Sequence, residues 1–95
     1  MKTTINIVWD NIVKNENEVF HTIRGVPYTY VVKENFVLIN NDRKRKITKD
    51  AVGKTLNIEN PTPSKIESEG IWGPSYVYGI ITDNRILNSG NEKYI

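Results

Sequence analysis

Cysteine is absent from this chain of 95 residues, and histidine occurs once, as His21. The lack of cysteine excludes disulfide bonds, thiolate nucleophiles and cysteine-based zinc sites within the chain, and it is typical of a reducing compartment, here expected to be the cytoplasm. A lone histidine is a natural general base near neutral pH, but catalysis needs a partner for it. Ser75 is not such a partner, because its surroundings lack the second glycine of a nucleophile turn. The aspartates show no spacing typical of metal ligands. We therefore expect no enzymatic activity, no metal and no cofactor.

Long apolar runs and glycine-rich phosphate loops are missing as well. The apolar stretch after Thr4 is interrupted by Asn6 and Asp10, and it is too short and too polar for a signal sequence or a membrane span. The glycines at 70, 73 and 79 match neither a P-loop nor a dinucleotide-binding fingerprint. We expect a protein that is neither exported nor embedded in a membrane.

The composition is that of a folded globule. Hydrophobic residues make up 38% of the chain, and two Trp, five Tyr and two Phe supply its aromatic side chains. At this size, folding buries only somewhat more than roughly 60% of the surface that the unfolded chain exposes, so the core is small. We find no internal repeat and no linker between two cores. One domain is therefore expected over residues 1–88, with a flexible C-terminal tail at 89–95.

The first half of the chain predicts a helix followed by three strands. Apolar residues at i, i+3, i+4, i+7 and i+8 favour a helix at 4–14 with Thr3 or Thr4 as its cap, although a strand through Ile5, Ile7 and Trp9 is the alternative. β-Branched and aromatic residues then predict strands at 19–23, 28–33 and 36–39. Their short connections favour an antiparallel meander, because parallel pairing needs a long crossover.

The second half predicts two helices. Thr48 is placed as the N-cap of a short helix that ends near Asn57. A proline-rich loop follows at 60–64, after which a single helical turn is expected, and Pro74 then begins a longer helix through residue 82. Gly79 lies inside this helix, where it either lets another backbone approach closely or shows that the helix is irregular. The predicted class is α+β: an N-terminal helix, a three-stranded antiparallel meander and two C-terminal helices on one face, with a winged-helix arrangement as the alternative.

Positive charge is concentrated in one stretch. Residues 41–54 hold six Lys or Arg and two Asp, a local charge of 6 − 2 = +4 in a chain whose total is +2. Such a stretch attracts phosphates or an acidic protein surface, and a solvated loop that aids solubility is the alternative interpretation. The predicted contacts to a nucleic-acid backbone are the basic run and two further cations: Arg43, Lys44, Arg45, Lys46, Lys49 and Arg24.

Aromatic residues suggest two other surfaces. Tyr28, Tyr30 and Phe36 are a possible platform for unpaired bases, but packing under the helices is the favoured interpretation. The stretch at 70–76 combines two glycines and a proline with Trp72 and Tyr76. It predicts either a core plug or a protein-binding patch made by Trp72, Tyr76 and Arg85.

Two stretches resemble those of a small, uncharacterised bacterial domain: FHTIRGVPYTY at 20–30 and GPSYVYGIITDNRI at 73–86. The likeness spans most of the chain. Such domains occur alone or beside nuclease-type genes in bacteria and mobile elements, which implies an accessory role with nucleic acid. No functional residue is carried over from this resemblance.

The leading functional prediction is a small, non-enzymatic nucleic-acid-binding accessory module that contacts phosphates through the basic loop. The alternative is a protein-binding adaptor or inhibitor from a phage or mobile element, which docks through Trp72 and Tyr76 or through the basic loop. The sequence leaves open whether the target is DNA, RNA or protein, and it leaves the oligomeric state open.

Overall fold

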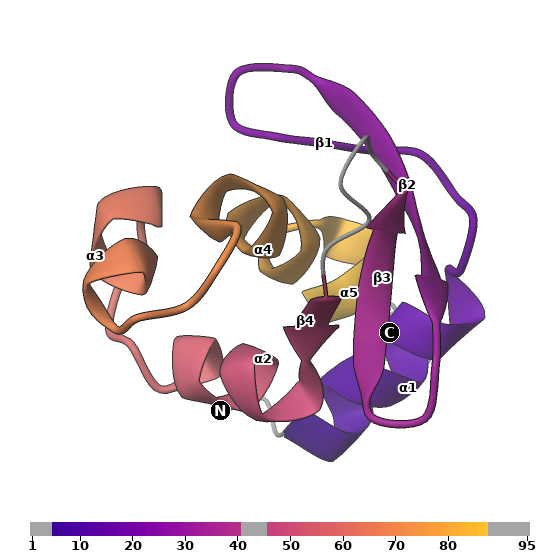
Figure 1. Ribbon diagram of the computed structural model, residues 1–95, viewed down its shortest axis with the longest axis horizontal. Coiled ribbons are helices and arrows are strands. Elements are labelled where there is room, and N and C mark those ends of the chain that lie inside the picture. Colours follow the sequence, from indigo (N-terminus) through magenta and orange to yellow (C-terminus); the bar gives the residue numbers. More distant parts are fainter. Residues whose placement is uncertain (1–4, 41–45, 88–95) are drawn as a thin grey trace, which may run out of the picture.

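The computed structural model describes residues 5–40 and 46–87. Along the chain, its helices and strands are α1 (Ile5–Lys14), β1 (Phe20–His21), β2 (Pro27–Val32), β3 (Phe36–Asn40), β4 (Lys46–Thr48), α2 (Lys49–Leu56), α3 (Pro63–Ser68), α4 (Pro74–Ile81) and α5 (Asn84–Leu87). The helices gather on one side of the sheet (Figure 1). The predicted α+β class is confirmed. Among the described residues, no helix is long and apolar enough to cross a membrane.

The sheet has four antiparallel strands in the order β1-β2-β3-β4, so the predicted meander is present and one strand longer than expected. The strand that sequence reasoning missed, β4, has three residues and pairs with β3 through Ile47 opposite Val37. Three residues are too few to show an alternating pattern, and these begin inside the basic run. Strand β1 covers only Phe20–His21 of the predicted 19–23. Val19 and Ile23 lie outside it and are about half exposed.

Helix α1 has the predicted periodicity, with Val8 and Ile12 fully buried, but Val13 from the expected stripe is 44% exposed. Asn11 is buried on the same side of the helix, and its amide donates a 2.6 Å hydrogen bond to the carbonyl of Ile86. This bond ties α1 to α5 across the core. The predicted cap at Thr3 or Thr4 lies outside the described residues.

Tyr28 and Tyr30 point into the core from β2, where they are 5% and 0% exposed. The Tyr30 hydroxyl donates to the carbonyl of Ile12 at 2.6 Å, and the Tyr28 hydroxyl donates to the carbonyl of Tyr76 at 2.8 Å. Burial raises the pKa of both phenols. The β2–β3 hairpin therefore packs under the helices and does not project as the wing of the alternative arrangement.

Four helices follow the sheet in the described part of the chain, where two were expected. Helix α2 begins as predicted, because the Thr48 hydroxyl accepts from the N–H of Ala51 at 3.0 Å. Helix α4 also begins at Pro74 as predicted. Helix α3, of six residues, lies where a single helical turn was expected, and α5, of four residues, was not expected; neither is long enough for a periodic apolar pattern. The predicted tail at 89–95 lies outside the described residues.

At Gly79, α4 approaches the sheet closely. A Cβ atom at this position would lie 2.5 Å from the carbonyl oxygen of His21 and 2.7 Å from the hydroxyl of Tyr28. Of the two interpretations of this glycine, the close backbone approach is therefore the correct one. The helix lies against β1 because one of its residues has no side chain.

We expect Gly79→Ala to lower the free energy of unfolding by about 1–3 kcal/mol, because the backbone of β1 cannot yield as a flexible side chain does. The matched variant is Gly53→Ala in α2, whose Cβ would meet only Ile5, at 3.8 Å. That change should raise stability by up to about 1 kcal/mol through helix propensity. Urea denaturation of both variants measures the contrast, and equal stabilisation by the two alanines would contradict the packing of α4 described above.

Candidate nucleic-acid interface

Strand β4 and helix α2 carry the part of the basic stretch that the structure describes. Arg43, Lys44 and Arg45 lie outside the described residues. The Nζ of Lys46 lies 4.8 Å from the ring centroid of Phe36, and the Nζ of Lys49 lies 5.9 Å from that of Trp9. Both ammonium groups therefore rest against aromatic rings, which orients the side chains at little cost in solvation.

A cleft of about 280 Å³ opens beside this strand-helix unit. One wall comes from β4 and α2, and the other comes from the segment that joins α3 to α4. The lining residues are Lys46, Ile47, Thr48, Asp50, Ala51, Lys54, Glu69, Gly70, Ile71 and Trp72. The two surfaces that the sequence predicted separately, the basic stretch and the Trp72 segment, thus share one cleft.

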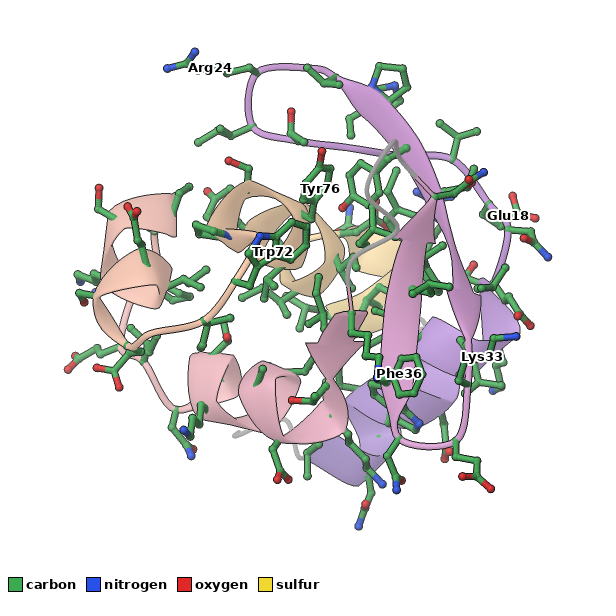
Figure 2. All side chains as sticks on the ribbon, in the orientation of Figure 1. Glu18, Arg24, Lys33, Phe36, Trp72 and Tyr76 are labelled. Carbon is green, nitrogen blue, oxygen red and sulfur yellow. The ribbon has the colours of Figure 1, made fainter. Side chains whose placement is uncertain are left out.

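Trp72 is held in this wall by ring stacking. Trp72 and Tyr76 lie side by side (Figure 2), with ring centroids 5.8 Å apart at an interplanar angle of 18°. Tyr76 in turn meets Tyr28 edge to face at 4.9 Å. Gly73 precedes α4 with a positive φ of 69°, a conformation that turns the chain sharply between Trp72 and Pro74. Trp72 is only partly buried, so it both packs on the core and lines the cleft.

The cleft carries charges of both signs. Lys46 and Lys54 are balanced in number by Asp50 and Glu69. Within residues 5–40 and 46–87 the structure holds one salt bridge, which joins Arg85 to Asp83, so no ion pair closes the cleft. Sequence reasoning missed Lys54 and Asp50 as lining residues, although their i, i+4 spacing on α2 places them on one helix face. Glu69 had no such signal, because only the fold brings it opposite α2.

Arg85 does not line this cleft and instead bonds to Asp83 and Val19. Its Nε lies 2.9 Å from Oδ1 of Asp83, one Nη donates to Oδ2 at 3.0 Å and to the carbonyl of Val19 at 2.8 Å, and its Cζ lies 4.0 Å from the Phe20 ring centroid. The hydrogen bond from Arg85 lowers the pKa of the Asp83 carboxyl, and the same bond raises the pKa of Arg85. Arg85 thus joins α5 to the segment before β1, and a chain of ring contacts through Phe20 and Tyr28 leads from it to Tyr76.

Arg24 lies apart from the other predicted phosphate contacts. It occupies the loop between β1 and β2, at the opposite end of the sheet from Phe36, over which Lys46 lies (Figure 2). The loop is ordered by hydrogen bonds from Gly25 N to the Thr22 carbonyl at 2.8 Å and from Val26 N to the Thr22 hydroxyl at 3.1 Å. The structure therefore places Arg24 apart from Lys46, and Lys46 and Lys49 lie over two different rings, those of Phe36 and Trp9.

The proposed aromatic platform does not form. Tyr28 and Tyr30 face the core, whereas Phe36 is partly exposed and alternates with the buried Val37 on β3. Neighbouring side chains on a strand point to opposite faces, so Phe36 lies on the other face of the sheet from the two tyrosines. The favoured interpretation, aromatic packing in the core, is correct for both tyrosines.

His21 is exposed and lines a smaller hollow of about 240 Å³ with Tyr78 and Asp83. Among the described residues, no group of three or more His, Asp or Glu side chains is placed to hold a metal ion. Comparison of the chain with known protein families, with curated proteins and with solved structures gives no match.

The Asp83–Arg85 pair predicts a pH-dependent contribution to stability. Because the folded-state pKa of Asp83 is lowered, this contribution is present above the unfolded pKa of about 3.9 and is lost as the pH falls through the folded value. Asp83→Asn should lower the free energy of unfolding by about 1 kcal/mol at neutral pH, after allowance for solvent screening. The difference from wild type should narrow as the pH falls below about 4.

Chemical denaturation between neutral and acid pH measures this difference. Asp10→Asn is the matched control, because it removes one carboxylate from an exposed position that makes no salt bridge among the described residues. A difference between wild type and Asp83→Asn that stays constant at every pH would contradict a role for the charged pair.

Proposed function

We propose that this protein is a small, non-enzymatic nucleic-acid-binding module that contacts phosphates through Arg43, Lys44, Arg45, Lys46 and Lys49. The observation that carries the proposal is the joint placement of cations and an aromatic wall. Lys46 and Lys54 line one cleft with Trp72, and the three arginine and lysine residues at 43–45 immediately precede Lys46 in the sequence. An accessory role in the bacterial cytoplasm, or in a phage or mobile element, fits the lack of cysteine and the resemblance described above.

The charge distribution supports contact with a limited number of phosphates. The net charge is only +2, so the chain lacks the strong overall positive charge with which a protein binds DNA over its whole surface. The stretch at 41–54 is instead a local source of attraction, at +4, within a chain that is otherwise slightly acidic. Neutralising phosphates releases counterions, so binding through this stretch has to weaken as salt rises.

We expect fluorescence anisotropy with labelled duplex DNA, single-stranded DNA and RNA to show salt-sensitive binding. The slope of log K against log salt should be about −0.9 per phosphate neutralised on duplex DNA and about −0.7 on single strands. Replacing Arg43, Lys44 and Arg45 by Ala should reduce the magnitude of the slope by up to three such increments.

The matched control replaces Lys14, Lys33 and Lys65 by Ala. It changes the net charge by the same amount, from +2 to −1, through exposed residues outside the basic stretch. Circular dichroism establishes that both triple variants remain folded. Equal loss of binding in the two variants would attribute the effect to net charge, and no binding by wild type at low salt would refute the proposed function.

A protein-binding adaptor or inhibitor is the second candidate, and exposed apolar side chains favour it. Ile23 and Val26 are 58% and 53% exposed on either side of Arg24, and Val19 is 50% exposed just before β1. Apolar exposure in an ordered loop is a feature of protein contacts. The Trp72–Tyr76 pair is the other docking surface for this candidate. If the protein is an adaptor, we expect no binding of nucleic acid at any salt concentration, and we expect Trp72→Ala to abolish binding of the protein partner.

A further inference from the structure

We propose that the cleft between β4, α2 and Trp72 receives one unpaired nucleobase, so that the protein prefers single strands to duplex. The inference rests on the proposed function, because it specifies which form of nucleic acid the site takes. It also assigns a role to Lys54, Asp50 and Glu69, which the charge pattern of the sequence did not single out.

The first argument is the shape of the cleft. Its volume of about 280 Å³ lies just under the roughly 300–1,000 Å³ of pockets that hold drug-sized ligands, which suits a single ring system. One wall is the indole of Trp72, which is kept in place by its stack on Tyr76 at 5.8 Å. Bases within a duplex expose only their edges in the grooves, so an aromatic wall in a cleft is useful only to a base that has left its stack.

The second argument is the distribution of charge around this wall. Asp50 and Glu69 are exposed carboxylates that make no salt bridge among the described residues, and carboxylates accept hydrogen bonds from the amino groups of bases. Lys54 lines the same cleft and is suited to a phosphate that flanks the base, whereas Lys46 also lines it but holds its ammonium over the Phe36 ring. Cytosine, adenine and guanine have an exocyclic amino group, whereas thymine and uracil lack one. The cleft should therefore favour the amino-bearing bases.

The third argument concerns the backbone of β4, which is one of the two edge strands of the sheet. The N–H of Lys49 donates to the carbonyl of Asn35 at 2.8 Å. In an antiparallel ladder every second residue bonds to the neighbouring strand, so the backbone N–H and C=O of Ile47 also face β3. The N–H of Thr48 and the C=O of Lys46 consequently point away from β3, on the side where the sheet is open. These groups offer a donor and an acceptor to a base edge, while an edge of three residues offers few bonds to an added peptide strand.

The test uses the emission of Trp72 in a Trp9→Phe background, so that one indole reports on the cleft. The probes are twelve-nucleotide homopolymers of dC, dA and dT and a duplex of mixed sequence. We expect dC and dA strands to quench Trp72 saturably and to bind more tightly than dT, and we expect the duplex to bind without quenching. Trp72→Leu, followed by anisotropy, should weaken single-strand binding by roughly 5- to 150-fold and leave duplex binding unchanged.

Surface variants keep the test independent of folding, since Trp72 also packs on the core. Asp50→Asn with Glu69→Gln should reduce the preference for dC over dT, and Lys54→Ala should weaken all single strands, whereas Lys65→Ala should do neither. Equal binding of single strands and duplex without quenching would overturn this inference and leave the proposed function standing. Binding of no nucleic acid at low salt would overturn both.

Discussion

The close contact between Gly79 of α4 and the backbone of β1 is the constraint on which the rest of the structure depends. A Cβ atom there would overlap the His21 carbonyl and the Tyr28 hydroxyl, so only glycine allows the helix to lie at this depth. At this depth the Tyr28 hydroxyl reaches the carbonyl of Tyr76. The same placement positions the segments on either side of α4. Before the helix, Trp72 lines a cleft with β4, and after the helix, Arg85 donates to the carbonyl of Val19.

The candidate site depends on this placement because its walls come from distant parts of the chain. Lys46 and Lys54 belong to the strand-helix unit formed by β4 and α2, whereas Glu69 and Trp72 belong to the connection before α4. Their combination of cations, carboxylates and an indole suits a ligand with phosphate, amino and ring groups better than a simple polyanion. The function that we propose does not need a broad basic surface, which a chain of net charge +2 does not supply.

Elements with strong local signals were predicted from the sequence. Helix α1 was found from its apolar spacing, α2 from the Thr48 cap, α4 from Pro74, and the first three strands from their composition and short connections. Strand β4 and helices α3 and α5 were missed or only partly foreseen, because six residues or fewer do not establish a period. Arg85 was predicted as an interface residue, but its bond to the carbonyl of Val19 depends on how α5 meets the start of β1, which no local pattern encodes.

The sequence by itself determined the absence of thiol chemistry, the concentration of positive charge at 41–54 and the face that each longer helix buries, because these follow from composition and from spacing along the chain. Only the tertiary structure decided that Tyr28 and Tyr30 pack inside the core, that Arg24 lies away from Lys46, and that Trp72 meets Lys46 and Lys54 across one cleft. The physical reason is that such contacts are set by how side-chain volumes fit between elements far apart in the chain, and a single residue such as Gly79 decides how closely those elements approach.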